Sequence, residues 1–183
     1  MKGVVFVEFL ELVEKKFGLE VVDEIIEKSK VTSKGIYTSV GIYPSSEMFQ
    51  LVQALSKKTK ISKDVLLLGF AVHFFSYIKE NPSIFIKRYS NPINLPASIE
   101  NHIHVEVLKI HPNAELPNFE VVEQTKDSIN FLYKSSRAML FFAMGFIKKT
   151  FEYFNSTANI VYKKIKEEGT EVKFTVTTIH ESR

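Results

Sequence analysis

The chain of 183 residues contains no cysteine and no tryptophan. Without cysteine there can be no disulfide framework, no thiolate metal site, no iron–sulfur cluster and no cysteine nucleophile. No apolar stretch reaches the roughly 18 residues that a membrane-spanning helix needs, and the first residues lack the small-residue cleavage site of a signal peptide. We therefore expect a cytoplasmic, globular protein that does not bind membranes.

An excess of charge of either sign is also lacking, because 24 basic residues face 21 acidic ones and no basic block is longer than two residues. A nucleic-acid-binding protein concentrates positive charge, so no nucleic-acid partner is expected. The phosphate-binding loops Gly-x-x-x-x-Gly-Lys and Gly-x-Gly-x-x-Gly are absent, and so is the Gly-x-Ser-x-Gly nucleophile elbow. These absences argue against kinase and hydrolase chemistry, and we expect the chain not to be an enzyme.

What the chain has in quantity is aromatic side chains, with 16 phenylalanines and seven tyrosines. Its length predicts a single domain over 1–183. The first half reads as helices, because Phe6, Leu10, Val13 and Phe17 recur at helical period and Gly18 follows as a helix-ending glycine. A lobe of helices is expected over 1–60, followed by a second lobe over 61–183.

After residue 117 the pattern changes to short β-prone runs. Residues 119–124 and 129–133 predict a hairpin, 138–154 a strongly apolar helix, and 160–165 and 172–179 two further strands. In the last run apolar and polar residues alternate, which is typical of a sheet with one face in water. The expected fold class is α+β, with an antiparallel sheet of about four strands in the second lobe.

The histidines are the first candidates for chemistry, and two of them, His102 and His104, fall in a predicted helix from about residue 98 to 110. At i and i+2 they point about 200° apart, so they cannot both bind one buried metal. His104 shares its side of the helix with Leu108 and is therefore the more inward of the two. From this pattern alone, a structural core histidine is the simpler interpretation. The other histidines are His73, His111 and His180.

The strongest local motif is Tyr133-Lys134-Ser135-Ser136-Arg137, at the end of a predicted strand. A phenol, a hydroxyl and a guanidinium within five residues are hydrogen-bond donors suited to a carboxylate. The pattern therefore predicts a receptor for an acidic group. A tyrosine at a strand end beside a surface arginine would give the same letters by chance.

Three features together carry a resemblance to a family. Tyr133-x-Ser135-x-Arg137 follows His104 by 29 residues, Pro117 follows that histidine by 13, and Met1-Lys2-Gly3 opens the chain. Over its whole length the chain resembles the haem–nitric oxide/oxygen binding (H-NOX) family, the bacterial relative of the haem domain of soluble guanylate cyclase. The resemblance implies haem b as the cofactor, held between a distal helical lobe and a proximal lobe.

The resemblance also implies roles for single residues. His104 matches the proximal ligand of the haem iron, with His102 as the competing histidine. Pro117 matches the proline that presses on the porphyrin and distorts it, and Val5 falls where an aliphatic residue contacts the other side of the ring. The haem propionates are assigned to three donors: Tyr133, Ser135 and Arg137.

Gas selectivity is expected to depend on the distal pocket. Relatives that hold dioxygen resemble one another in a distal tyrosine that corresponds to Phe142, and in a tryptophan that corresponds to Phe9. Phenylalanine donates no hydrogen bond, so NO and CO are favoured over dioxygen, although His73 or Tyr77 is left open as an unexpected donor. The expected distal wall is apolar: Phe9, Val72, Phe142 and Phe146. Some relatives bind zinc through cysteines, a site that this chain should lack.

The mechanism implied by the resemblance is that NO weakens the bond between iron and His104, the porphyrin relaxes toward planarity, and a partner in trans reads the change. By analogy the partner is a histidine kinase or a cyclic-di-GMP enzyme. A haem-free domain of the same fold, which binds a hydrophobic ligand or acts as a scaffold, is the alternative. A redox enzyme that uses haem is a weaker third reading, because the apolar pocket offers no evident acid or base.

Overall fold

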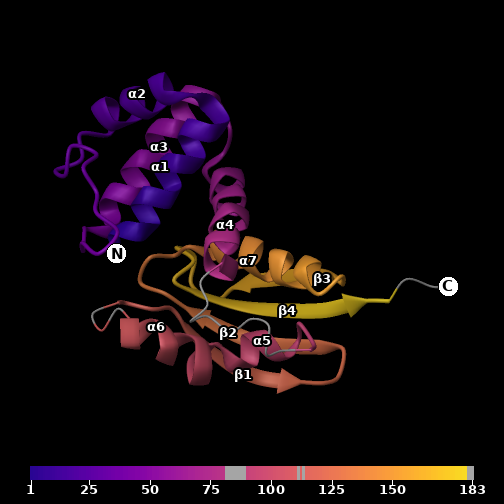
Figure 1. Ribbon diagram of the computed structural model, residues 1–183. Helices are drawn as coiled ribbons and strands as arrows, with labels where there is room; N and C mark the ends of the chain where they lie inside the picture. The colour runs from indigo at the N-terminus through magenta and orange to yellow at the C-terminus, as the bar shows by residue number, and fades with distance from the viewer. Residues whose placement is uncertain (81–89, 111, 113, 181–183) are drawn as a thin grey trace. The chain divides into compact units, whose positions relative to one another are not determined.

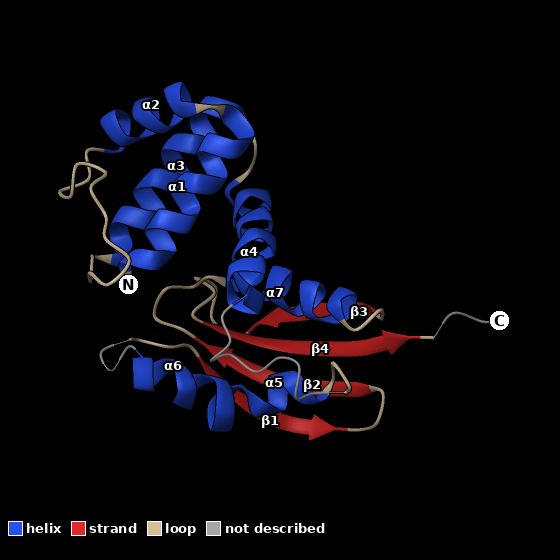
Figure 2. Ribbon diagram, in the orientation of Figure 1, coloured by secondary structure: helices blue, strands red, loops and turns tan. Residues whose placement is uncertain are grey.

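The computed structural model describes residues 1–80, 90–110, 112 and 114–180, so His111 lies outside the described residues (Figure 1). The chain divides into two compact units, Met1–Tyr77 and Ile78–Arg183. The first unit is helical, and all four strands belong to the second (Figure 2). Each unit is described on its own below.

The helical unit is built on a core of phenylalanine and aliphatic side chains. Phe6 and Val13 are fully buried, and Gly18 ends the first helix with a φ of 90° and an N–H bonded to the carbonyl of Glu14. Gly3 has no room for a Cβ, which would lie 1.9 Å from the carbonyl oxygen of Thr38. The helices are α1 (Gly3–Phe17), α2 (Leu19–Ser29), α3 (Ser45–Thr59) and α4 (Lys63–Glu80).

The second unit contains an antiparallel sheet with the strand order β1-β2-β4-β3. A short helical region precedes the sheet, and one long helix separates the two hairpins of strands. These elements are α5 (Asn94–Ser98), a π-helical turn (Ile99–Ile103), α6 (His104–Ile110), β1 (Asn118–Gln124), β2 (Ser128–Lys134), α7 (Leu140–Tyr153), β3 (Thr157–Lys164) and β4 (Glu171–Ile179).

One face of this sheet is apolar and the other is polar. Phe131 of β2 and Phe174 of β4 are paired in register, stack at 5.3 Å between ring centroids and are fully buried. Ile147 of α7 belongs to the same buried cluster. On the opposite face the hydroxyl of Thr175 donates to the Asn130 side chain at 2.7 Å. The alternation predicted a sheet with one face in water, and the burial of β2 and β4 confirms it. The α+β class and the four-stranded antiparallel sheet are likewise confirmed.

The region before the sheet differs from expectation in one respect. The single helix predicted from about residue 98 to 110 is instead a π-helical turn that leads directly into α6. A π turn inserts one extra residue into the helical period, and such turns are frequent at functional sites. Because the insertion keeps most residues helical, the apolar pattern does not reveal it.

Within the described ranges, no single helix has the length and apolar character to cross a membrane. Only α3 and α4 taken together satisfy those criteria, and the two are bent by 113° at their junction.

Candidate functional site

His104 is the first residue of α6 and follows the π turn directly. Its side chain is 11% exposed, whereas His102 is an exposed residue of the π turn. The structure thus gives the inward position to the histidine that the helical pattern favoured. A buried imidazole on a helix that faces an aromatic core can bind a group inside the protein.

Glu100, one turn earlier, contacts the same imidazole. Its Oε1 lies 3.5 Å from Nδ1 of His104 and accepts a hydrogen bond of 2.5 Å from the backbone N–H of Phe119. Burial lowers the pKa of His104, and the Glu100 carboxylate partly opposes this effect. The neutral imidazole is therefore favoured, and a carboxylate beside Nδ1 directs the proton there and leaves Nε2 as a metal ligand.

Aromatic rings connect His104 to the sheet. The ring of Phe119, on β1, lies 5.9 Å from that of His104 and 5.5 Å from that of Tyr133 on β2. Residues that are 29 positions apart in the chain are thus joined through one intervening side chain. The structure brings the candidate iron ligand and the first residue of the candidate acid receptor into one aromatic cluster.

The donor motif begins at the end of β2 and continues into a tight turn. Tyr133 is 3% exposed, and its pKa is raised by burial, with opposing effects from the Ser135 hydroxyl and the Arg137 charge. Ser135 donates its N–H to Thr170 at 2.8 Å and accepts that of Ala138 at 3.1 Å. Ala138 has a φ of 49°, so the chain turns sharply there. The turn holds all three motif side chains within range of one another.

Arg137 has a buried donor without a partner. Its Nη2 donates to the backbone carbonyl of Glu115, while Nε is buried and makes no hydrogen bond to any described residue. A buried unpaired donor costs about 1–3 kcal/mol, and more when it is charged. A carboxylate would remove that cost. The donor set and this unpaired atom fit the acidic side chains of haem, and neutral His104 fits its iron.

Pro117 lies just before β1 and is half-buried. It is in the loop that Arg137 holds through the carbonyl of Glu115. The loop is therefore tied to the motif in the same unit. That Pro117 presses on a porphyrin stays a prediction.

The predicted distal residues are divided between the two units. In the helical unit, Val72 is half-buried, and Phe9 is 1% exposed and packs edge-on against Phe70 at 5.3 Å. Val5, the predicted porphyrin contact, is also half-buried, and its role stays a prediction. On α7, the rings of Phe142 and Phe146 lie 6.0 Å apart. Ala143 and Ile147, the next residue after each, face the sheet core, so the two rings point to another side of the helix. Their distal role stays a prediction.

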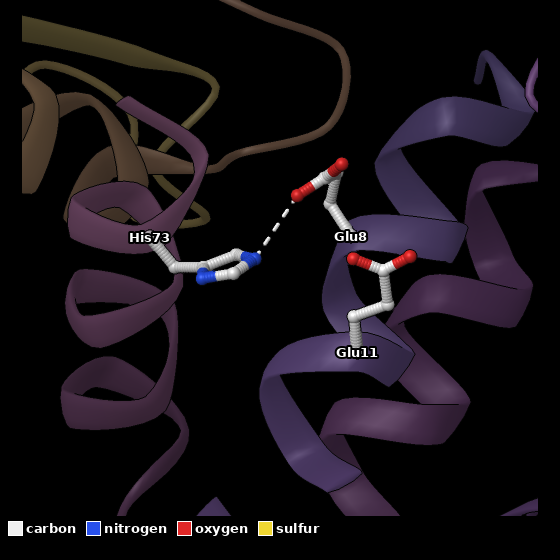
Figure 3. Close-up of side chains that lie close together, drawn as sticks. All are labelled: Glu8, Glu11 and His73. Atoms are coloured by element: carbon white, nitrogen blue, oxygen red, sulfur yellow. Dashed lines mark hydrogen bonds and ion pairs between the residues drawn. The ribbon is translucent and has the colours of Figure 1, made fainter. Parts of the chain in front are cut away.

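The two donors that the sequence left open have partners in the helical unit. Nε2 of His73 lies 3.0 Å from a carboxylate oxygen of Glu8 on α1 (Figure 3). Tyr77 stacks on Phe74 at 5.5 Å, and burial, with a smaller effect of the Glu8 charge, raises its pKa. Sequence reasoning did not find Glu8, nor did it find Glu100 and Phe119. The i−4 spacing from His104 was the available signal for Glu100.

A family model and several solved structures are similar to this chain. The family model described as "Haem-NO-binding" matches residues 2–162. The chain is similar to the Fe(II) unliganded H-NOX protein of K. algicida, with 56% identity, a TM-score of 0.96, and 99% of this chain and 98% of that one covered. It is also similar to the H-NOX of Shewanella woodyi in the Fe(II)CO state, with 35% identity, a TM-score of 0.80, and 97% and 94% covered.

A third structure shares the fold at lower identity. It is an H-NOX protein from S. oneidensis in the Fe(II)NO state, with 22% identity, a TM-score of 0.88, and 98% of this chain and 100% of that chain covered. The matches confirm the resemblance that rested on His104, Pro117 and the Tyr133-x-Ser135-x-Arg137 motif, and with it haem iron as the cofactor.

Proposed function

Because the chain belongs to the haem-NO-binding (H-NOX) family, we propose that it senses NO, and also binds CO, at a ferrous haem held by His104. The observation that carries this proposal is the buried, unpartnered Nε of Arg137, next to Tyr133 and joined through Phe119 to a neutral imidazole. An acid receptor and an iron ligand in one cluster fit the peripheral propionates and the central iron of haem.

The protein's contribution begins with binding and orientation. Tyr133, Ser135 and Arg137 receive the propionates, and His104 donates Nε2 to the metal while Glu100 keeps the proton of the ring on Nδ1. When bound, ferrous haem would supply the metal that binds a diatomic gas. His104 would hold this metal to the protein, and is the residue through which NO binding would be felt.

Selectivity for NO and CO over dioxygen is assigned to the absence of a donor among four side chains. Bound dioxygen carries partial negative charge and gains from a hydrogen bond, which phenylalanine and valine cannot provide. Nε2 of His73 is directed toward Glu8, so this donor has another contact. The ring of Tyr77 stacks on Phe74, which does not engage its hydroxyl, and Tyr77 stays an open donor. The four side chains are Phe9, Val72, Phe142 and Phe146.

The output is a movement of the segment that carries His104. Release of His104 from the haem would free α6, whose Val105 and Leu108 are 43% and 40% exposed. A shift of α6 would change an apolar surface that a partner protein can contact. By family resemblance, that partner is a histidine kinase or a cyclic-di-GMP enzyme acting in trans.

Absorbance spectroscopy tests this function. Protein purified with a haem supply should be coloured, and its ferrous Soret band should shift when NO, and separately CO, is added under anaerobic conditions. Protein that stays colourless, or a ferrous Soret band that neither gas moves, would contradict the proposal. A colourless protein that binds an apolar dye would favour the haem-free alternative.

A further inference from the structure

A second group of ligand-type side chains lies in the helical unit, on α1 and α4. Glu8 and Glu11 are one turn apart on α1 and so share a face, and His73 reaches toward them from α4 (Figure 3). One ligand atom from each of the three residues lies within 4.8 Å of the other two. The haem-holding residues are all in the other unit, so this group is a separate feature.

The chemistry of the group is that of a transition-metal site. An imidazole nitrogen with two carboxylate oxygens is a mixed donor set, which suits first-row divalent ions better than the all-oxygen set that Mg²⁺ and Ca²⁺ prefer. Three protein ligands leave further positions for water, as in open zinc sites. We propose that Glu8, Glu11 and His73 bind one divalent first-row metal ion, of the class of Zn²⁺ and Mn²⁺.

Two of the three ligands are already held in place. The side chains of His73 and Glu8 are 22% and 13% exposed and meet at 3.0 Å. Close by, Phe9 and Phe70 pack edge-on at 5.3 Å and fix α1 against α4. The positions of the two ligands are therefore set by a packed core, which lowers the entropy lost on metal binding.

The third ligand gives access from solvent. Glu11 is an exposed residue, so its carboxylate can rotate onto an incoming ion without repacking the core. The site thus has two fixed ligands and one mobile ligand.

Binding would link two helices that carry assigned gas-pocket residues. Glu8 precedes Phe9 on α1, and His73 follows Val72 on α4. A metal that bridges the helices restrains both, so metal binding should change the rate of gas dissociation. This consequence rests on the proposed function, whereas metal binding itself does not.

Electron paramagnetic resonance with Mn²⁺ as the probe tests the site on haem-loaded protein. The Fe(II)–CO form has no unpaired electron, so the six-line spectrum reports only free Mn²⁺. We expect loss of that signal with one ion bound per chain, and release of the Mn²⁺ when Zn²⁺ is added. Glu11→Gln should weaken binding by at least about tenfold, and thermal unfolding of this exposed variant should match the parent.

The matched control is Glu14→Gln, which removes an exposed carboxylate one turn further along α1 and should bind Mn²⁺ as the parent does. His73→Gln is the second variant and should also weaken binding. No Mn²⁺ uptake by the parent, or equal uptake by the parent and Glu11→Gln, would overturn the site. The Soret band of the same samples reports haem loading, so a failure of the proposed function is distinguished from a failure of this proposal.

Discussion

Two histidine–glutamate pairs lie in the two units of this chain, and they are built differently. In the second unit, Glu100 and His104 are four residues apart on one continuous helical segment, and the histidine is the more buried partner. In the helical unit, Glu8 and His73 are 65 residues apart on two helices, and the carboxylate is the more buried partner. The same two residue types thus meet with the order of burial reversed.

The difference teaches what each pair can do. Burial lowers the pKa of His104 and favours the neutral ring, which is the form that ligates iron inside a haem pocket. The other pair presents a nearly buried carboxylate together with an imidazole and a second, exposed carboxylate, a set that suits a divalent cation. Under the proposed function, the first pair adjusts one iron ligand, whereas the second pair joins two helices.

Replacing the histidines is the strongest way to break the comparison. His104→Ala should abolish haem binding, because among the described residues His104 is the histidine whose ring contacts the cluster of Phe119 and Tyr133. Added imidazole should restore the Soret band. His102→Ala and His73→Gln should keep the parental Soret band. Loss of haem from His102→Ala with retention in His104→Ala would reverse the assignment.

The next largest effect should come from removing the guanidinium of Arg137 from the acid receptor. The pair of Glu8 and His73 has no group of this kind. Arg137→Met loses charge-assisted hydrogen bonds worth about 1.5–3 kcal/mol each. Haem should therefore transfer to excess apomyoglobin about 10- to 100-fold faster. Lys134→Met, which removes an exposed cation of the same motif, is the control. A parental transfer rate in Arg137→Met would show that this residue does not hold the propionates.

A hydroxyl on α7 sharpens the comparison by adding a hydrogen-bond donor at a position predicted to line the distal pocket. Phe142→Tyr should allow a ferrous dioxygen complex, with affinity raised by about tenfold or more for one hydrogen bond to partial charge. The matched control is Phe141→Tyr, since Phe141 packs against Tyr162 of β3. If only the control gained dioxygen binding, the account of selectivity would be wrong, and NO binding would be unaffected.

The smallest expected effects come from neutralising the two carboxylates. Glu100→Gln should lower the Fe–His stretching frequency in the resonance Raman spectrum of ferrous protein, because an amide makes the imidazole a weaker donor. Glu8→Gln should leave that frequency unchanged and lower the free energy of unfolding by about 1 kcal/mol. An unchanged frequency in Glu100→Gln would mean that Glu100 does not influence the ligand.

Local sequence patterns predicted most of the fold because the relevant forces are local. Gly18 ends α1 as its position indicated, and the alternation from Val172 onward gave the buried face of β4. β3 starts at Thr157, three residues before the apolar run at Ile160, because strand pairing with β4 continues over polar residues. Such pairing leaves no mark in the hydrophobic pattern.

The candidate site was predictable to the extent that its residues form a motif. His104 and the residues from Tyr133 to Arg137 are visible from spacing alone. The π turn before His104 and the aromatic bridge through Phe119 depend on tertiary packing, which a single sequence does not encode at fixed spacing. The pair of Glu8 and His73 is further still from prediction, since α1 and α4 must first pack together.

The most direct test of the central claim is a crystal structure of the haem-loaded ferrous protein. The account predicts iron bonded to Nε2 of His104, with Nδ1 facing Glu100 and the propionates on Tyr133, Ser135 and Arg137. Iron held by His102, by His73 or by no histidine would contradict it.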